Sequence, residues 1–223
     1  MIQLAGLFLI ALAGCAGITT QEQTAADNIK RNMNAQSVKV SHVRNVLIGD
    51  VETDCVQYEI VMTDIDRTDK TASVLAVQLN DMLNDTVKKD YPGITIQLTD
   101  SVRNLSEKYS YLFTDLKLAG TKLNLVDSVI SCFINTDYRK VYNLMGPAIK
   151  QQVTLEETIA TFSKMDSTYG ATQVANLQGV RFIKLDGRDV MQYEAILSRK
   201  GGNNRLLVNI AKTADNEIVS IKL

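Results

Sequence analysis

Side chains that act as nucleophiles or bases are scarce in this chain of 223 residues. There is one histidine, His42, so a histidine paired with a serine or cysteine nucleophile, or several histidines around a metal, is nearly excluded by count. Cys55 and Cys132 have no CxxC partner and no neighbouring base, which argues against thiol catalysis. The sequence therefore predicts no catalytic residue, no metal site and no cofactor.

The acidic motif DIDRTD at residues 64–69 resembles a calcium-binding loop only superficially. The glycine at the sixth position and the glutamate at the twelfth, which such loops need, are both missing. We expect Asp64, Asp66 and Asp69 to cap a helix or to solvate a turn. Glu156 and Glu157 fall in the first turn of a predicted helix, where carboxylates favour the helix dipole.

A pocket is the remaining place where chemistry could occur. The candidates for its lining are four tyrosines, with two acids as polar partners: Tyr138, Tyr142, Tyr169, Tyr193, Asp127 and Glu194. The alternative is that these tyrosines close the rim of a core with their hydroxyl groups in water. Both interpretations stay open at the level of sequence.

The first residues form an apolar run that is too short to cross a membrane. From Ile2 to Ala13 no residue is charged, but a helical span needs roughly 20 apolar residues. Small residues and the polar stretch TTQEQTAADN follow the run. This pattern predicts a secretory signal peptide over residues 1–14.

The run ends in Leu12, Ala13, Gly14 and Cys15, which resembles the lipobox of bacterial lipoproteins. The resemblance implies that Cys15 carries a diacylglyceryl group, that the peptide is cut before it, and that the new amino terminus is acylated. Two or more acyl chains anchor a protein stably. We therefore expect a cell-envelope protein held on a bacterial membrane, at its periplasmic or extracellular face, with residues 15–37 as lipidated tether and lead-in.

The segment lacks the lysine or arginine that usually begins a signal peptide, so an ordinary signal peptide and an uncleaved anchor remain as alternatives. Outside the cytoplasm disulfides persist. Cys55 and Cys132 could therefore form a disulfide, and the alternative is that they are two separate buried thiols.

Charge and composition narrow the range of partners. The chain has 24 basic and 25 acidic residues, interspersed along its length, and a net charge of −1. This balance argues against a nucleic-acid partner and against a polybasic membrane surface. With 45% hydrophobic residues the chain can form a packed core.

Hydrophobic periodicity predicts an α+β module in the first half. Alternating residues predict strands at 38–48 and 53–63, and a three-and-four spacing predicts an amphipathic helix at about 69–89. Two further strands follow in ITIQLTD and KYSYLFTDLKL. The module, strand-strand-helix-strand-strand, is predicted to span residues 38–118, with a domain boundary at 116–122.

In the second half, predicted helices come first and strands afterwards. Thr154 and Glu157 have the spacing of a capping box, so a helix should begin there and end at Gly170. Four strand-like runs follow, at residues 172–184, 189–199, 205–213 and 217–222. Their turns, DGR, GGNN and ADNE, suit hairpins, so the pattern predicts an antiparallel sheet wrapped over helices.

Residues 123–223 resemble the cystatin-like α+β cone of nuclear-transport-factor-like domains. The resemblance is carried by the order of elements, by the segment FINTDYRKVYNLMGPAIKQQVTLEETI and by the strands after Met191. It implies a cone-shaped domain that often encloses a pocket between sheet and helices, and enzymes of the class place an aspartate, glutamate or histidine inside it.

Two functions follow as predictions. The first is a non-enzymatic binding or assembly module, anchored to the envelope, with a protein or small molecule as its partner. The alternative is an enzyme that uses a pocket in the cone for acid–base chemistry on a small molecule. A carboxylate that faces an apolar pocket would favour the enzyme, because burial raises its pKa.

Overall fold

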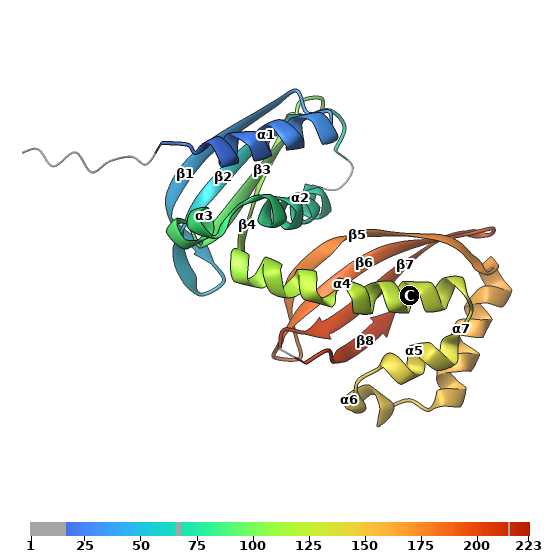
Figure 1. Ribbon diagram of the computed structural model, residues 1–223. Coiled ribbons are helices and arrows are strands. Elements are labelled where there is room, and N and C mark those ends of the chain that lie inside the picture. The colour runs from blue at the N-terminus through green and yellow to red at the C-terminus, as the bar shows by residue number, and fades with distance from the viewer. Residues whose placement is uncertain (1–16, 66–67, 214) are drawn as a thin grey trace, which may run out of the picture.

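The computed structural model describes residues 17–65, 68–213 and 215–223. The predicted signal peptide at residues 1–14 and the predicted lipid attachment at Cys15 lie outside these residues. In the described part, each half of the chain has helices and a four-stranded sheet (Figure 1). This confirms the predicted α+β fold class.

The first half is a mixed sheet covered by helices. Its elements are α1 (Thr20–Asn32), β1 (Ser37–Ile48), β2 (Val51–Met62), α2 (Thr68–Met82), α3 (Asp85–Asp90), β3 (Gly93–Asp100) and β4 (Leu105–Leu112). In the order β1-β2-β3-β4, β2 and β3 are parallel and the outer pairs are antiparallel. Parallel neighbours need a crossover, which α2 and α3 provide. Leu75, Leu79 and Ile94 lie in the buried core between helices and sheet.

The sequence predicts a tether and lead-in over residues 15–37, but the structure has a helix, α1, in much of this range. Thr19 and Glu22 form a capping box: the Glu22 N–H donates to Thr19 Oγ1 at 3.2 Å, and the Thr19 N–H donates to Glu22 Oε2 at 2.7 Å. Ile29, on the inner face of the helix, is fully buried in the first core. This part of the chain is therefore packed against the sheet.

One continuous helix, α4 (Phe113–Ile134), connects the two halves. The predicted boundary at residues 116–122 lies inside this helix, so it is not a loop between domains. The last predicted strand of the first module ends earlier than expected, at Leu112, because α4 begins at Phe113. The two sheets still fall on either side of the predicted division.

The second half follows the predicted order of helices and then strands. Its elements are α5 (Tyr138–Leu144), α6 (Pro147–Lys150), α7 (Leu155–Tyr169), β5 (Thr172–Leu185), β6 (Arg188–Arg199), β7 (Gly202–Ala211) and β8 (Ile218–Lys222). The sheet is antiparallel in the order β5-β6-β7-β8. The capping box of Thr154 and Glu157 is present, and Gly170 ends α7, as predicted.

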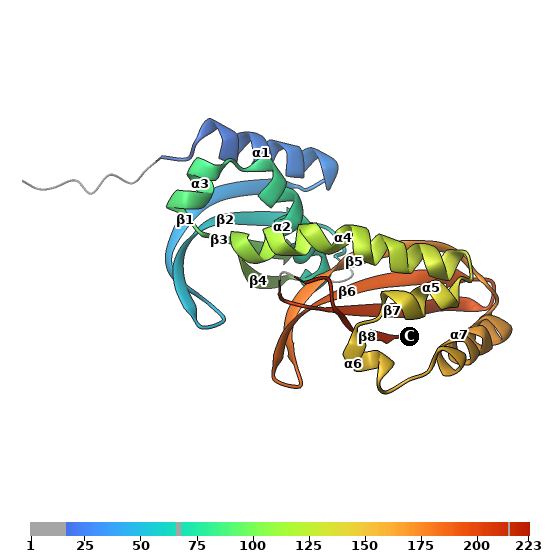
Figure 2. The same cartoon turned by 60° about the horizontal axis from the view of Figure 1, so that its bottom comes forward.

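The halves contact each other where α2 packs against β5 and α4. Across this contact the Val180 N–H donates to Ser73 Oγ at 3.2 Å; within the second core, the Tyr193 hydroxyl donates to the Ala119 carbonyl of α4 at 2.7 Å. A Cβ on Gly179 would lie 2.4 Å from Ser73 Oγ, so only glycine allows this approach. Figure 2 shows the β1–β2 and β5–β6 hairpins projecting to the same side of the molecule.

Candidate functional site

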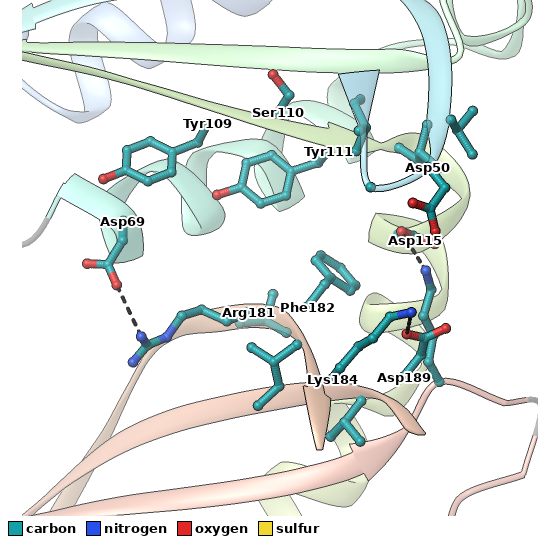
Figure 3. Close-up of a pocket in the computed structure, with 18 residues that line it drawn as sticks. Asp50, Asp69, Tyr109, Ser110, Tyr111, Asp115, Arg181, Phe182, Lys184 and Asp189 are labelled. Carbon is teal, nitrogen blue, oxygen red and sulfur yellow. Dashed lines mark hydrogen bonds and ion pairs between the residues drawn. The ribbon is translucent and has the colours of Figure 1, made fainter. Parts of the chain in front are cut away.

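A cleft of about 580 Å³ lies between the two halves. The first half contributes the tip of the β1–β2 hairpin, α2 and β4, and the second contributes β5 and β6 (Figure 3). The lining consists of residues 48–51, 109–112 and 180–184 with Asp69, Asp115, Asp189, Val190 and Lys212. Because both halves build it, the cleft exists only while they are packed together.

Aromatic side chains form the middle of the cleft. Tyr109 and Tyr111 pair in register with Ile96 and Ile94 of β3, so all four side chains lie on the same face of the sheet. The Tyr111 and Phe182 rings meet edge to face, with 6.3 Å between their centroids. Phe182 packs against both hydrophobic cores, so it joins the two halves at the floor of the cleft.

The Tyr111 hydroxyl is a free hydrogen-bonding group at this wall, with no partner among the described residues. Burial raises the pKa of Tyr111 above its ordinary value of 10, so the hydroxyl is uncharged at neutral pH. The Tyr109 hydroxyl is already engaged, since it donates to Glu107 Oε2 at 2.5 Å and lies 2.9 Å from Thr68 Oγ1. Tyr111 is therefore the hydroxyl that a ligand can use.

Charged side chains flank the aromatic part. At the α2 end, Arg181 lies 3.7 Å from Asp69. At the hairpin end, Lys212 donates to Asp115 Oδ2 at 2.8 Å, with its ammonium 5.8 Å from the centroid of the Phe182 ring. The cleft thus combines an apolar centre with polar ends, the composition expected of a small-molecule site.

Two more charges at the hairpin end are loosely held. Lys184 and Asp189 approach only to 4.0 Å, and both are mostly exposed. Asp50, at the tip of the β1–β2 hairpin, has no partner among the described residues. These groups can move to meet a ligand at little cost, because exposed pairs contribute little to stability.

A buried ion network lies behind Arg181. Lys70 of α2 donates to Glu194 of β6, and Arg181 donates to the other carboxylate oxygen at 3.1 Å. Lys70 and Glu194 are almost completely buried. Burial alone would raise the pKa of Glu194, but the hydrogen bond and charge of Lys70, together with Arg205 and Arg181, hold that pKa below its ordinary value.

The four predicted pocket tyrosines do not come together in one pocket. Tyr138 is buried among Phe133 and Phe162, and its hydroxyl donates to Asp166. Tyr193 is also buried and borders a separate hollow of about 180 Å³ between α2, α4 and β5.

The other two predicted tyrosines lie nearer the surface. Tyr142 is half-buried, with the Lys150 ammonium 5.6 Å from its ring centroid, and Tyr169 is exposed at the end of α7. Of the two acids predicted as partners, Asp127 is exposed on α4 and Glu194 belongs to the buried network. The interior that the tyrosines were predicted to line is packed with apolar side chains of the second core.

His42 fixes α1 to the first sheet. Its Nε2 lies 2.8 Å from Glu22 Oε1, and its Nδ1 lies 2.9 Å from the Tyr91 hydroxyl. The His42 and Tyr91 rings are stacked, with 4.0 Å between their centroids. The histidine therefore has the role of a satisfied structural partner.

Cys55 and Cys132 are separate buried thiols, one in each half. This decides between the two alternatives that the sequence left open. Burial raises the pKa of both thiols, so neither is an activated nucleophile.

No protein-family model, no curated protein and no solved structure matches this chain. Over residues 17–65, 68–213 and 215–223, no helix is both long and apolar enough to cross a membrane. Within the same ranges no cluster of histidine, cysteine and acidic side chains could hold a metal ion.

The sequence did not point to the cleft, because its residues come from distant segments. The one local signal was the pair Tyr109 and Tyr111, whose period-two spacing places two aromatic rings on the same face of a strand. Their partner across the cleft, Phe182, lies 71 positions after Tyr111 in a strand of the other half. The packing of α2 against β5 and α4 brings the two walls together.

Proposed function

We propose that this protein is a lipid-anchored binding module of the bacterial cell envelope, and that its ligand binds in the cleft between the two halves. The observation that carries the binding role is the cleft itself. It is built from both halves, has an aromatic centre and polar ends, and contains a free tyrosine hydroxyl.

The proposed anchor depends on the sequence around Cys15. An apolar run of about a dozen residues followed by Leu12, Ala13, Gly14 and Cys15 supports attachment of lipid to the thiol. The cap of α1 at Thr19 comes four residues after Cys15 in the sequence. Four steps of at most 3.8 Å would hold the first half within about 15 Å of the lipidated residue.

The anchor is tested with the full chain produced in a bacterium. We expect the wild-type protein to fractionate with membranes and to take up a radiolabelled fatty acid. Cys15→Ser should lose the label and remain as uncut precursor or leave the membrane fraction. A Cys15→Ser protein that is still labelled and mature would contradict the anchor.

The binding role is tested with indole as a neutral aromatic probe and titration calorimetry. We expect indole to bind the wild-type protein, and Val51→Trp, which places a large ring at the mouth of the cleft, to weaken binding at least severalfold. Leu47→Trp is the matched control, because Leu47 lies on the same hairpin, is 70% exposed and does not line the cleft. Equal binding by the two variants, or no binding by the wild type, would contradict a site in the cleft.

The enzymatic alternative lacks a specific observation in its favour. It needs a carboxylate whose pKa is raised toward neutrality by an apolar pocket. The buried Glu194 instead forms an ion pair with Lys70, and the partly exposed Asp166 pairs with Arg199. The pKa of Glu194 is lowered, which is the opposite of what a general acid at neutral pH requires.

A further inference from the structure

The charges at the hairpin end of the cleft do not balance. Of the described residues that line this end, three carry a carboxylate, Asp50, Asp115 and Asp189 (Figure 3), and two carry an ammonium group, Lys184 and Lys212. Lys212 is bound to Asp115, and Lys184 is the loose partner of Asp189. The remaining negative charge is that of Asp50, which stands at the mouth of the cleft.

The other end of the cleft has no such excess. Among the described residues that line the cleft, this end has one cation and one anion, Arg181 and Asp69, which lie 3.7 Å apart. A charged ligand is therefore attracted to the hairpin end, and its charge must be positive to complement Asp50.

The complementary cation is an organic one. In the described part of the chain no three acidic, histidine or cysteine side chains approach closely enough to hold a metal ion, and the hairpin end is no exception. A protonated amine needs no such convergence, because one carboxylate and a neighbouring acceptor are sufficient partners.

The apolar centre of the cleft defines the rest of the ligand. Tyr111 and Phe182 present ring surface directly beside the charged end, and Ile48 and Val51 extend the apolar wall toward Asp50. The uncharged Tyr111 hydroxyl adds a neutral hydrogen-bonding group. A ligand that fits carries its amine within a few bonds of an aromatic or aliphatic group.

We propose that the cleft selects ligands in which a protonated amine is attached to a small apolar or aromatic group, with Asp50 as the residue that recognises the amine. This inference rests on the proposed binding role of the cleft.

The test compares two probes that share a phenylethyl group and carry opposite charges, 2-phenylethylamine and 3-phenylpropionate, by titration calorimetry at low salt. We expect the amine to bind the wild-type protein roughly two- to fivefold more tightly than the carboxylate, because the pair with Asp50 is exposed. Added salt should reduce this preference.

Asp50→Asn should abolish the preference, because it keeps the shape of the side chain and removes its charge. Asp186→Asn is the matched control: Asp186 is exposed at the tip of the β5–β6 hairpin and does not line the cleft. The preference should survive this change.

The outcomes separate this inference from the proposed function. If indole binds but the amine shows no advantage over the carboxylate, or if Asp50→Asn leaves the advantage intact, the recognition of amines is wrong and the cleft remains a binding site. If none of the three probes binds, the proposed binding role fails as well.

Discussion

The two sides of the junction between the halves differ in how their polar groups are held. On the closed side, where α2 packs on β5, Lys70 and Glu194 are buried and Ser73 is bonded to the backbone of β5. On the open side, in the cleft, the polar groups include Lys184 and Asp189 of the β5–β6 hairpin, which are 71% and 60% exposed and 4.0 Å apart. The comparison teaches that the closed side fixes the arrangement of the halves, which leaves the groups of the open side available to a ligand.

Removal of Lys70 should have the largest effect. Lys70→Ala leaves Glu194 buried with only Arg181 and the more distant Arg205, and breaking a buried pair in this way costs about 3 kcal/mol of unfolding free energy. Urea denaturation measures the loss. The double variant Lys70→Met with Glu194→Leu should recover much of it, since no buried charge is left unpaired: Arg181 keeps Asp69, and Arg205 is 52% exposed. A loss below about 1 kcal/mol for Lys70→Ala would show that the network does not hold the closed side.

Gly179→Ala should be the next most damaging change. The new Cβ would lie 2.4 Å from Ser73 Oγ and 3.3 Å from the Lys70 carbonyl, and overpacking of this kind costs about 1–3 kcal/mol. The matched control is Gly120→Ala in α4, whose Cβ would meet nothing within 4 Å. That change should stabilise the protein by up to about 1 kcal/mol, because glycine disfavours a helix. Thermal unfolding of both variants gives the comparison; a destabilised Gly120→Ala or an unaffected Gly179→Ala would contradict the described packing.

Acid should weaken the closed side by a smaller step, because protonation neutralises Glu194 without removing a side chain. The pKa of Glu194 is below its ordinary value of 4.5 in the folded protein. Its contribution to stability is therefore complete above about pH 4.5 and is lost as the pH falls through the folded pKa. We expect Glu194→Gln to be less stable than the wild type at pH 7 and to approach it as the pH is lowered. Parallel pH curves for the two proteins would contradict the role of the network.

The exposed pair of the open side should matter least. Lys184→Ala is expected to change the unfolding free energy by no more than about 0.5 kcal/mol, because both partners are mostly in water. Chemical denaturation of Lys184→Ala and Lys70→Ala under the same conditions measures the difference between their losses of unfolding free energy. Similar losses for the two variants would remove the distinction between the sides.

Local sequence patterns predicted most of the secondary structure. The alternation around Val56 and Tyr58 predicted a strand, and the capping-box spacing of Thr154 and Glu157 predicted the start of α7, because such signals act within a few residues. The same spacing occurs at Thr19 and Glu22, but the helix that follows was missed. Its buried face contains alanines with few large apolar residues, so its hydrophobic pattern is weak.

The candidate site was not predictable from the sequence. An amphipathic side chain makes a tyrosine a candidate for lining a pocket, but burial depends on packing: Tyr138 and Tyr193 are core residues, whereas Tyr169 is exposed. The cleft depends on contacts between segments more than 60 positions apart, such as Tyr111 with Phe182. No periodicity within one segment contains that information.

The most direct test of the account is an NMR titration of the protein, labelled with ¹⁵N, with indole. If the cleft is one site built by both halves, the amide signals of Tyr111 in the first half and Phe182 in the second should shift together, with the same apparent affinity. Shifts confined to one half, or shifts that gather at residues away from the cleft, would contradict it.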